Sequence, residues 1–204
     1  MSTEKKTKPL NMINDIFKNP ILNCKVSNTE AALEVYKEIR KKNESRKVSN
    51  RGGYQSPLLL REDREKIFTA EVMKDILEEA INVYGWKKPV NFNIDGAWFN
   101  ANEKGDYNIS HRHSKSHFSF IWYLKVPDSS SGQLILEHPD SGLIMTGLFD
   151  LKRSDKNHYN SETMQITPSE GLLVMFPASL KHRVERYEGQ ETRVSLAFNG
   201  SFKQ

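Results

Sequence analysis

Hydrophobic and polar positions follow two different patterns, which meet near Pro89. Before this residue, apolar side chains recur every three to four positions in two stretches, at about 29–42 and 64–84. This spacing predicts two amphipathic helices, and Gly85 is a suitable residue to end the second. Each helix has one apolar face, so each needs another surface to pack against.

After Pro89 the chain is rich in short runs of β-branched and aromatic residues separated by turn signals. These runs predict about nine strands with no helix between them. The candidate strands are 91–100, 107–113, 117–126, 133–137, 144–149, 162–166, 172–176, 182–188 and 192–201. A succession of strands without intervening helices excludes a βαβ fold and favours two antiparallel sheets of the jelly-roll kind, with the helices outside one sheet.

We therefore expect a mainly β protein with N-terminal helices, in three parts. Residues 1–9 are polar and basic and are expected to form a flexible tail. Residues 10–88 would form a helical N-terminal support, and residues 89–204 a jelly-roll core. The support and the core are expected to form one folding unit.

Three segments lack a strong pattern. Residues 10–26 have room for a short edge strand, and the glycine pair within 49–59 (SNRGGYQSPLL) predicts a loop. The polar segment 150–161 is the longest without an assignment, and such loops often form a lid or rim.

Composition excludes several classes of protein. A single cysteine in 204 residues rules out a disulfide scaffold and a cysteine-based zinc cluster. No apolar run is long enough to span a membrane, and the N-terminus has no signal-peptide pattern, so we expect a soluble cytoplasmic protein without a membrane partner. The net charge of +4 is mild, and the basic stretch 37–51 is typical of a solvated helix end. Nucleic acid is therefore not an expected partner, and no sequence feature indicates the oligomeric state.

Histidines are concentrated in HRHSKSH, residues 111–117. On a strand, His111 and His113 would point to the same side and could bind one metal ion. His182 lies far along the chain, on a segment that a jelly roll can bring beside them. The alternative is that the pair is an ordinary feature of a polar strand and that His182 is a strand-edge residue.

Arg193 and Ser195 share one face of the otherwise apolar segment TRVSLAF. An inward-facing arginine is costly unless it meets an anion, and a guanidinium beside a hydroxyl suits a carboxylate. The alternative is an outward-facing arginine paired with a surface glutamate.

The segments HRH, SFIWYLKVP, GQLILEHP, LLVMFPASLKHRVE and TRVSLAFN together resemble the Fe(II)- and 2-oxoglutarate-dependent oxygenases. The resemblance covers about residues 90–202. It is closest to the prolyl-hydroxylase-like branch and to a family of uncharacterised 2-oxoglutarate-Fe(II) oxygenases from bacteria and phages, to which the SNRGGYQS loop is also similar. It implies a double-stranded β-helix, the jelly roll of these enzymes.

The resemblance also implies site residues. His111, His113 and His182 would hold Fe(II). Arg193, Ser195 and Tyr123 would bind the far carboxylate of 2-oxoglutarate, and Leu134 and Leu136 would form the apolar wall of its pocket. The activity that the resemblance implies is that of a dioxygenase. Such an enzyme consumes dioxygen and 2-oxoglutarate, releases succinate and CO₂, and hydroxylates a C–H bond of a small-molecule or peptide substrate.

His113 departs from the common pattern, which has an aspartate or glutamate at this position. His113 could ligate the iron, or its side chain could point away. In the second case water, chloride or His117 would occupy the third coordination position. Two other classes remain: a non-catalytic jelly-roll binding module, and a cupin-type three-histidine metalloenzyme that does not use 2-oxoglutarate. The retention of Arg193 and Ser195 favours the oxygenase.

Overall fold

The computed structural model describes residues 19–85, 91–140, 147 and 161–203. The expected tail, the strand predicted at 144–149 (apart from Gly147) and almost all of the predicted rim loop at 150–161 lie outside these residues.

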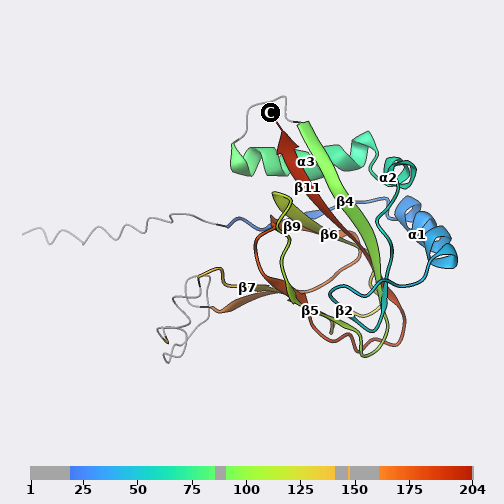
Figure 1. The fold of residues 1–204 in the computed structure, drawn as a ribbon. Coiled ribbons are helices and arrows are strands. Elements are labelled where there is room, and N and C mark those ends of the chain that lie inside the picture. Colours follow the sequence, from blue (N-terminus) through green and yellow to red (C-terminus); the bar gives the residue numbers. More distant parts are fainter. Residues whose placement is uncertain (1–18, 86–90, 141–146, 148–160, 204) are drawn as a thin grey trace, which may run out of the picture.

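Two antiparallel β-sheets face each other and form the centre of the molecule (Figure 1). The larger sheet has the strand order β1-β9-β6-β11-β4-β3. Its strands are β1 (Leu22–Lys25), β3 (Tyr54–Gln55), β4 (Asn91–Asn102), β6 (Phe118–Lys125), β9 (Leu172–Pro177) and β11 (Arg193–Lys203). The expected short edge strand within 10–26 is thus confirmed as β1.

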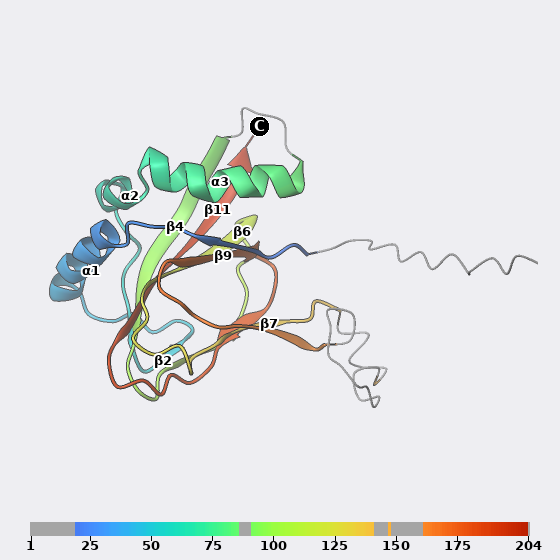
Figure 2. The ribbon, with the colours of Figure 1, turned by 180° about the vertical axis from the view of Figure 1, so that it is seen from behind.

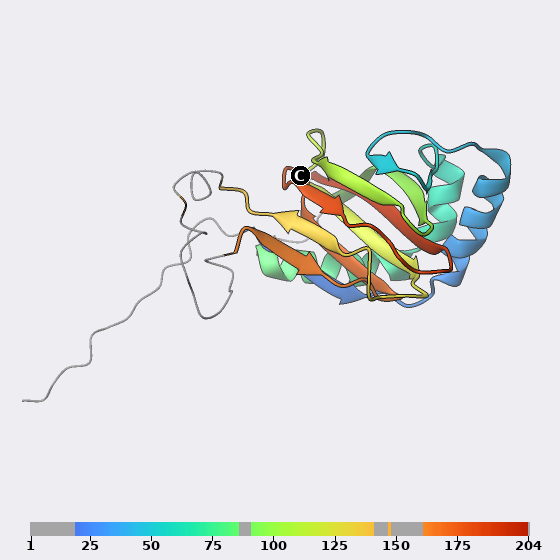
Figure 3. The same cartoon turned by 90° about the horizontal axis from the view of Figure 1, so that it is seen from below.

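The smaller sheet has the order β2-β5-β10-β7-β8 and lies in front when the molecule is seen from below (Figure 3). Its strands are β2 (Asn50–Arg51), β5 (Tyr107–His111), β7 (Leu134–Glu137), β8 (Thr163–Ile166) and β10 (His182–Val184). Two facing antiparallel sheets of this kind form a double-stranded β-helix, so the predicted fold class is confirmed.

Side chains of the larger sheet alternate between its two faces around the cavity, although bulges shift the register near Val194 and Asn199. On β4, Phe99 and Ala101 point to the helices, whereas Asn100 and Asn102 point to the smaller sheet and line a cavity. On β11, Leu196 packs on the helix side in the same way. Because strand residues alternate in direction, every second residue of β4, β6 and β11 is available to build a site between the sheets.

Three helices cover the outer face of the larger sheet (Figures 1 and 2). They are α1 (Glu30–Lys42), α2 (Arg61–Ile67) and α3 (Ala70–Tyr84). Their buried side chains form one hydrophobic core with the outward-facing residues of β4, β6 and β11. None of the described helices has both the length and the apolar character needed to cross a bilayer.

The prediction of a single helix at 64–84 is wrong, because the helix is interrupted at Phe68 and Thr69 and forms two helices, α2 and α3. Phe68 has a non-helical backbone (φ −90°, ψ 65°), and the Thr69 side chain accepts a hydrogen bond from the Val72 amide at the start of α3. Threonine at an N-cap position starts a new helix in this way. Gly85 ends α3 in the left-handed conformation, as predicted.

The segment expected to be only a loop at 49–59 contributes the short strands β2 and β3, one to each sheet. β2 pairs with β5 and β3 with β4, so the glycine turn between them connects the two sheets. Gly52 and Gly53 both have positive φ, and a side chain at Gly52 would collide with Asp106. This turn therefore requires glycine.

Candidate metal and cosubstrate site

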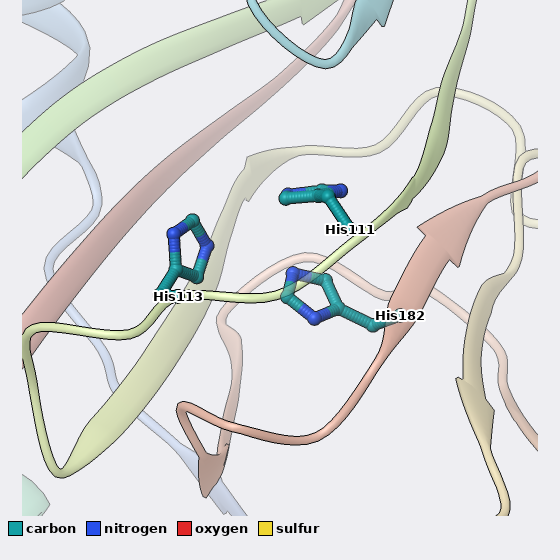
Figure 4. A group of neighbouring side chains, drawn as sticks. All are labelled: His111, His113 and His182. Atoms are coloured by element: carbon teal, nitrogen blue, oxygen red, sulfur yellow. The ribbon is translucent and has the colours of Figure 1, made fainter.

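Three histidines gather between the two sheets. His111 and His182 are direct cross-strand partners on β5 and β10, while His113 lies just beyond the end of β5 (Figure 4). One nitrogen from each ring lies within 4.8 Å of the others. His113 therefore reaches the cluster from an irregular segment, and not from the continued strand that was expected at 107–113.

Backbone carbonyl groups orient two of the imidazole rings. His111 Nδ1 donates to the Ile109 carbonyl oxygen at 2.8 Å, and His182 Nδ1 donates to that of Leu180 at 3.0 Å. A carbonyl can only accept, so Nδ1 carries the proton and the Nε2 lone pair is left for a metal. Such hydrogen bonds from the second nitrogen are typical of metal-binding histidines.

Burial keeps all three imidazoles neutral near neutral pH. Loss of solvent and, to a smaller extent, the neighbouring His111 together lower the pKa of His182 to about 3 and that of His113 to about 4. Burial also lowers the pKa of His111, against the carbonyl oxygen of Ile109, which raises it. Neutral imidazole is the form that binds a metal ion, and a set of three nitrogen donors suits Fe(II).

His117 stands outside this cluster and anchors the loop 112–117 that carries His113 and connects β5 to β6. Its amide donates to the Gly200 carbonyl, its own carbonyl accepts from the Ala178 amide, and its Nδ1 accepts from the Phe202 amide at 3.2 Å. The Ala178 carbonyl in turn accepts from the His113 amide. The loop is thus tied both to β11 and to the segment before His182.

The histidines line a cavity of about 540 Å³, including its open mouth, between the sheets. Arg193 lies in the same cavity and is only 2% exposed. Its Nη1 donates to the Gly132 carbonyl and its Nη2 to Asn102 Oδ1. These contacts fix the guanidinium group in place. Burial lowers the pKa of Arg193, but a guanidinium stays charged because its ordinary pKa is so high.

Two buried polar atoms at this end of the cavity, one of them on Arg193 itself, have no hydrogen-bond partner among the described residues. They are Arg193 Nε and the hydroxyl of Tyr123, a side chain that is 2% exposed. Tyr123 and Ser195 are cross-strand partners on β6 and β11, and both line the cavity. A buried donor without an acceptor costs free energy, and a carboxylate could accept from all three side chains. The residues therefore fit the far carboxylate of 2-oxoglutarate.

The structure brings six of the eight predicted residues to this cavity. Leu134 and Leu136 do not line it: they are buried with Tyr123 in the core between the sheets. Asn102 and Gly132, which orient Arg193, were missed. Asn102 could have been found as a polar residue at an inward position of β4, opposite Arg193. No sequence signal marks the Gly132 carbonyl.

The double-stranded β-helix with a histidine cluster defines a class of metal-dependent enzyme, and comparison with known proteins identifies the family. The model of the family described as "Putative 2OG-Fe(II) oxygenase" matches residues 96–199, which include the three histidines and Arg193. The chain belongs to this family, and it is a non-haem Fe(II)- and 2-oxoglutarate-dependent dioxygenase. No curated protein sequence matches the chain.

Solved structures share this fold at low sequence identity. A 2OG-Fe(II) oxygenase family oxidoreductase from Burkholderia pseudomallei is 12% identical with a TM-score of 0.61, over 89% of this chain and 85% of that one. A Pseudomonas putida prolyl-4-hydroxylase is 16% identical with a TM-score of 0.54, over 91% and 93% of the two chains. HygX from Streptomyces hygroscopicus, with nickel and 2-oxoglutarate bound, is 10% identical with a TM-score of 0.57, over 89% and 82%.

Proposed function

We propose that His111, His113 and His182 hold the Fe(II) ion and that Arg193, Ser195 and Tyr123 bind the far carboxylate of 2-oxoglutarate. The observation that carries this assignment is the pair of buried, unpartnered donors on Arg193 and Tyr123, in the same cavity as three neutral imidazoles. In a cupin-type enzyme that does not use 2-oxoglutarate, these donors would have no acceptor.

The bound iron and 2-oxoglutarate supply the oxidising power for attack on a C–H bond, using dioxygen and releasing succinate and CO₂. The protein orients the reactants and limits access of water. The carbonyl groups of Ile109 and Leu180 hold the protons on the distal nitrogens of two ligands. Gly132 and Asn102 hold Arg193 ready for the cosubstrate, which reduces the entropy lost on binding.

The substrate is proposed to be a small molecule or a peptide that is hydroxylated in the cytoplasm. Support comes from enzymes of the same fold: one relative is a prolyl-4-hydroxylase, and HygX has been solved with hygromycin B bound. The lone cysteine agrees with a reducing compartment.

Metal titration of single histidine variants tests the ligand assignment. Fe(II) or Co(II) should bind with one equivalent per chain. His111→Ala and His182→Ala should each lower the affinity by at least about tenfold, the range found for disturbing metal-site residues. His138→Ala is the matched control outside the cavity, and it should bind as the unchanged protein does. Unchanged metal affinity in either ligand variant would refute the assignment.

A further inference from the structure

A second polar row lies in the cavity at the opposite end from Arg193. Asn199 on β11 and Ser119 on β6 are cross-strand partners, and both line the cavity. Between this row and that of Ser195 lies the row of Ala197, which faces Trp98 and Ile121. Successive inward residues of a strand are about 7 Å apart, so the two polar rows are well separated.

The histidine cluster reaches the middle row through His113. The ring of His113 lies 5.7 Å from that of Trp98, measured between centroids. The cosubstrate would extend from the metal toward Arg193, on one side of this row. Asn199 and Ser119 lie on the other side and are not needed to hold 2-oxoglutarate. They are therefore placed to contact the substrate.

This row presents hydrogen-bond donors to the cavity. Ser119 Oγ, on a side chain only 3% exposed, donates to Asn199 Oδ1 at 2.8 Å. The bond engages the amide oxygen and turns the Asn199 amide nitrogen away from Ser119. That nitrogen has no hydrogen-bond partner within the described part of the chain. An amide held in this way favours a ligand that accepts hydrogen bonds.

The charge of the cavity indicates which kind of hydrogen-bond acceptor the substrate would present to Asn199. No aspartate or glutamate is among the described residues that line it. Most non-haem Fe(II) oxygenases have one carboxylate ligand, whereas here all three candidate ligands are imidazoles, which bind a metal ion in their neutral form. With Fe(II), the 2-oxoglutarate dianion and the Arg193 cation in place, one positive charge stays uncompensated. An anion beside the metal would be attracted to it.

We infer that Asn199, held by Ser119, is a specificity-determining residue that binds a carboxylate group of the substrate. The inference rests on the proposed function, because the excess charge arises only when iron and 2-oxoglutarate are bound at the assigned residues. It narrows the substrate class to small molecules or peptides with a carboxylate close to the oxidised carbon.

The test uses protein loaded with Co(II) and saturating 2-oxoglutarate, with acetate, acetamide and methylammonium as probes of similar size. The paramagnetic ion shortens the longitudinal relaxation time of methyl protons that bind near it. Acetate should be relaxed most and methylammonium least. The acetate effect should fall several-fold in Asn199→Leu and less in Ser119→Ala. Asn199→Asp should reverse the order of acetate and methylammonium. Asn91→Leu, which changes an exposed asparagine on β4, should match the unchanged protein.

Three results would overturn the inference. Equal acetate relaxation in the unchanged protein and in Asn199→Leu would mean that acetate binds the metal alone. Equal effects of acetate and acetamide would mean that charge is not recognised. Failure of the unchanged protein to bind Co(II) or 2-oxoglutarate, measured separately, would remove the proposed function and this inference with it. Normal loading of Asn199→Leu shows that the variant is folded.

Discussion

Arg193 is the residue whose surroundings say most about the chemistry. It is a buried cation with no carboxylate partner among the residues that the structure describes: its contacts there are a carbonyl, an amide oxygen and the rings of Tyr187 and Tyr123. Burial of a charge without a counter-ion is costly. The cost is offset when the anionic cosubstrate binds, so the free protein is prepared for a dianion.

Replacement of Arg193 should separate cosubstrate binding from metal binding. Arg193→Ala should weaken 2-oxoglutarate binding by about 10- to 150-fold, since a charge-assisted hydrogen bond contributes about 1.5–3 kcal/mol. Tyr123→Phe should weaken it by about tenfold, as expected for the loss of one hydrogen bond from a hydroxyl to a carboxylate. Isothermal titration of metal-loaded protein measures both values.

Arg61→Ala is the matched control, because Arg61 is an exposed residue of α2 that forms an ion pair with Glu65 on the same helix. Metal affinity should be the same in all three variants. Unaltered 2-oxoglutarate affinity in Arg193→Ala would remove Arg193 from the cosubstrate site.

The histidine cluster should make the stability of the metal-free protein depend on pH. The pKa of His182 is about 3 and that of His113 about 4 in the folded chain, against 6.5 for the exposed imidazole. The unfolded chain therefore binds these protons first. The contribution of these two histidines to stability should be complete above pH 6.5. As pH decreases from 6.5 toward 4, the free energy of unfolding should fall by up to about 1.4 kcal/mol per pH unit for each proton.

Urea unfolding of the metal-free protein between pH 4 and 7.5 measures this slope. The variant His182→Asn should have a shallower slope over the same range than the unchanged protein. A slope equal in His182→Asn and the unchanged protein would show that His182 is not held neutral by burial.

At the scale of elements, the loop 112–117 between β5 and β6 controls the position of one proposed ligand. His117 anchors it through two backbone hydrogen bonds and one side-chain hydrogen bond. His117→Ala should keep the backbone bonds, lose the contact with the Phe202 amide and loosen His113. We expect metal affinity to fall several-fold, and His117→Asn, whose Oδ1 can accept the same hydrogen bond, to retain more of it.

Metal titration by the same method as for the ligand variants measures this effect. His117 is not a proposed ligand, so its loss should be smaller than that of His111→Ala. A loss in His117→Ala as large as in His111→Ala, with no rescue by asparagine, would mean that His117 itself binds the metal.

Elements with strong periodicity could be predicted, and those that depend on distant contacts could not. The alternation along β4, β6 and β11 follows directly from the sequence, and so does the helix Glu30–Lys42. The break at Thr69 was missed because the apolar spacing continues across it. β2 and β3 were missed because two residues are too few for a pattern, and only their pairing with β5 and β4 makes them strands.

The same limit applies to the site. The histidine and arginine positions could be proposed from residue type and order along the chain. The loop anchored by His117 and the Gly132 carbonyl that holds Arg193 depend on backbone groups brought together only by the fold. Such groups have no side chain that would mark them in a sequence.

At the scale of the molecule, we propose that the N-terminal support and the jelly-roll core fold as one unit. β1 and β3 complete the larger sheet, β2 joins the smaller one, and the helices share a core with β4, β6 and β11. Urea unfolding followed by tryptophan fluorescence and by far-ultraviolet circular dichroism should therefore give coincident single transitions. Two separated transitions would show that the support unfolds independently.

The central claim is that one cavity binds Fe(II) and 2-oxoglutarate together. It is tested most directly by anaerobic titration of the Fe(II)-loaded protein with 2-oxoglutarate, followed by visible absorption. Bidentate chelation gives a weak metal-to-ligand charge-transfer band. We predict that this band appears and saturates with one equivalent of bound cosubstrate, and that it is lost in His111→Ala and greatly weakened in Arg193→Ala. Iron binding without any such band would contradict the account.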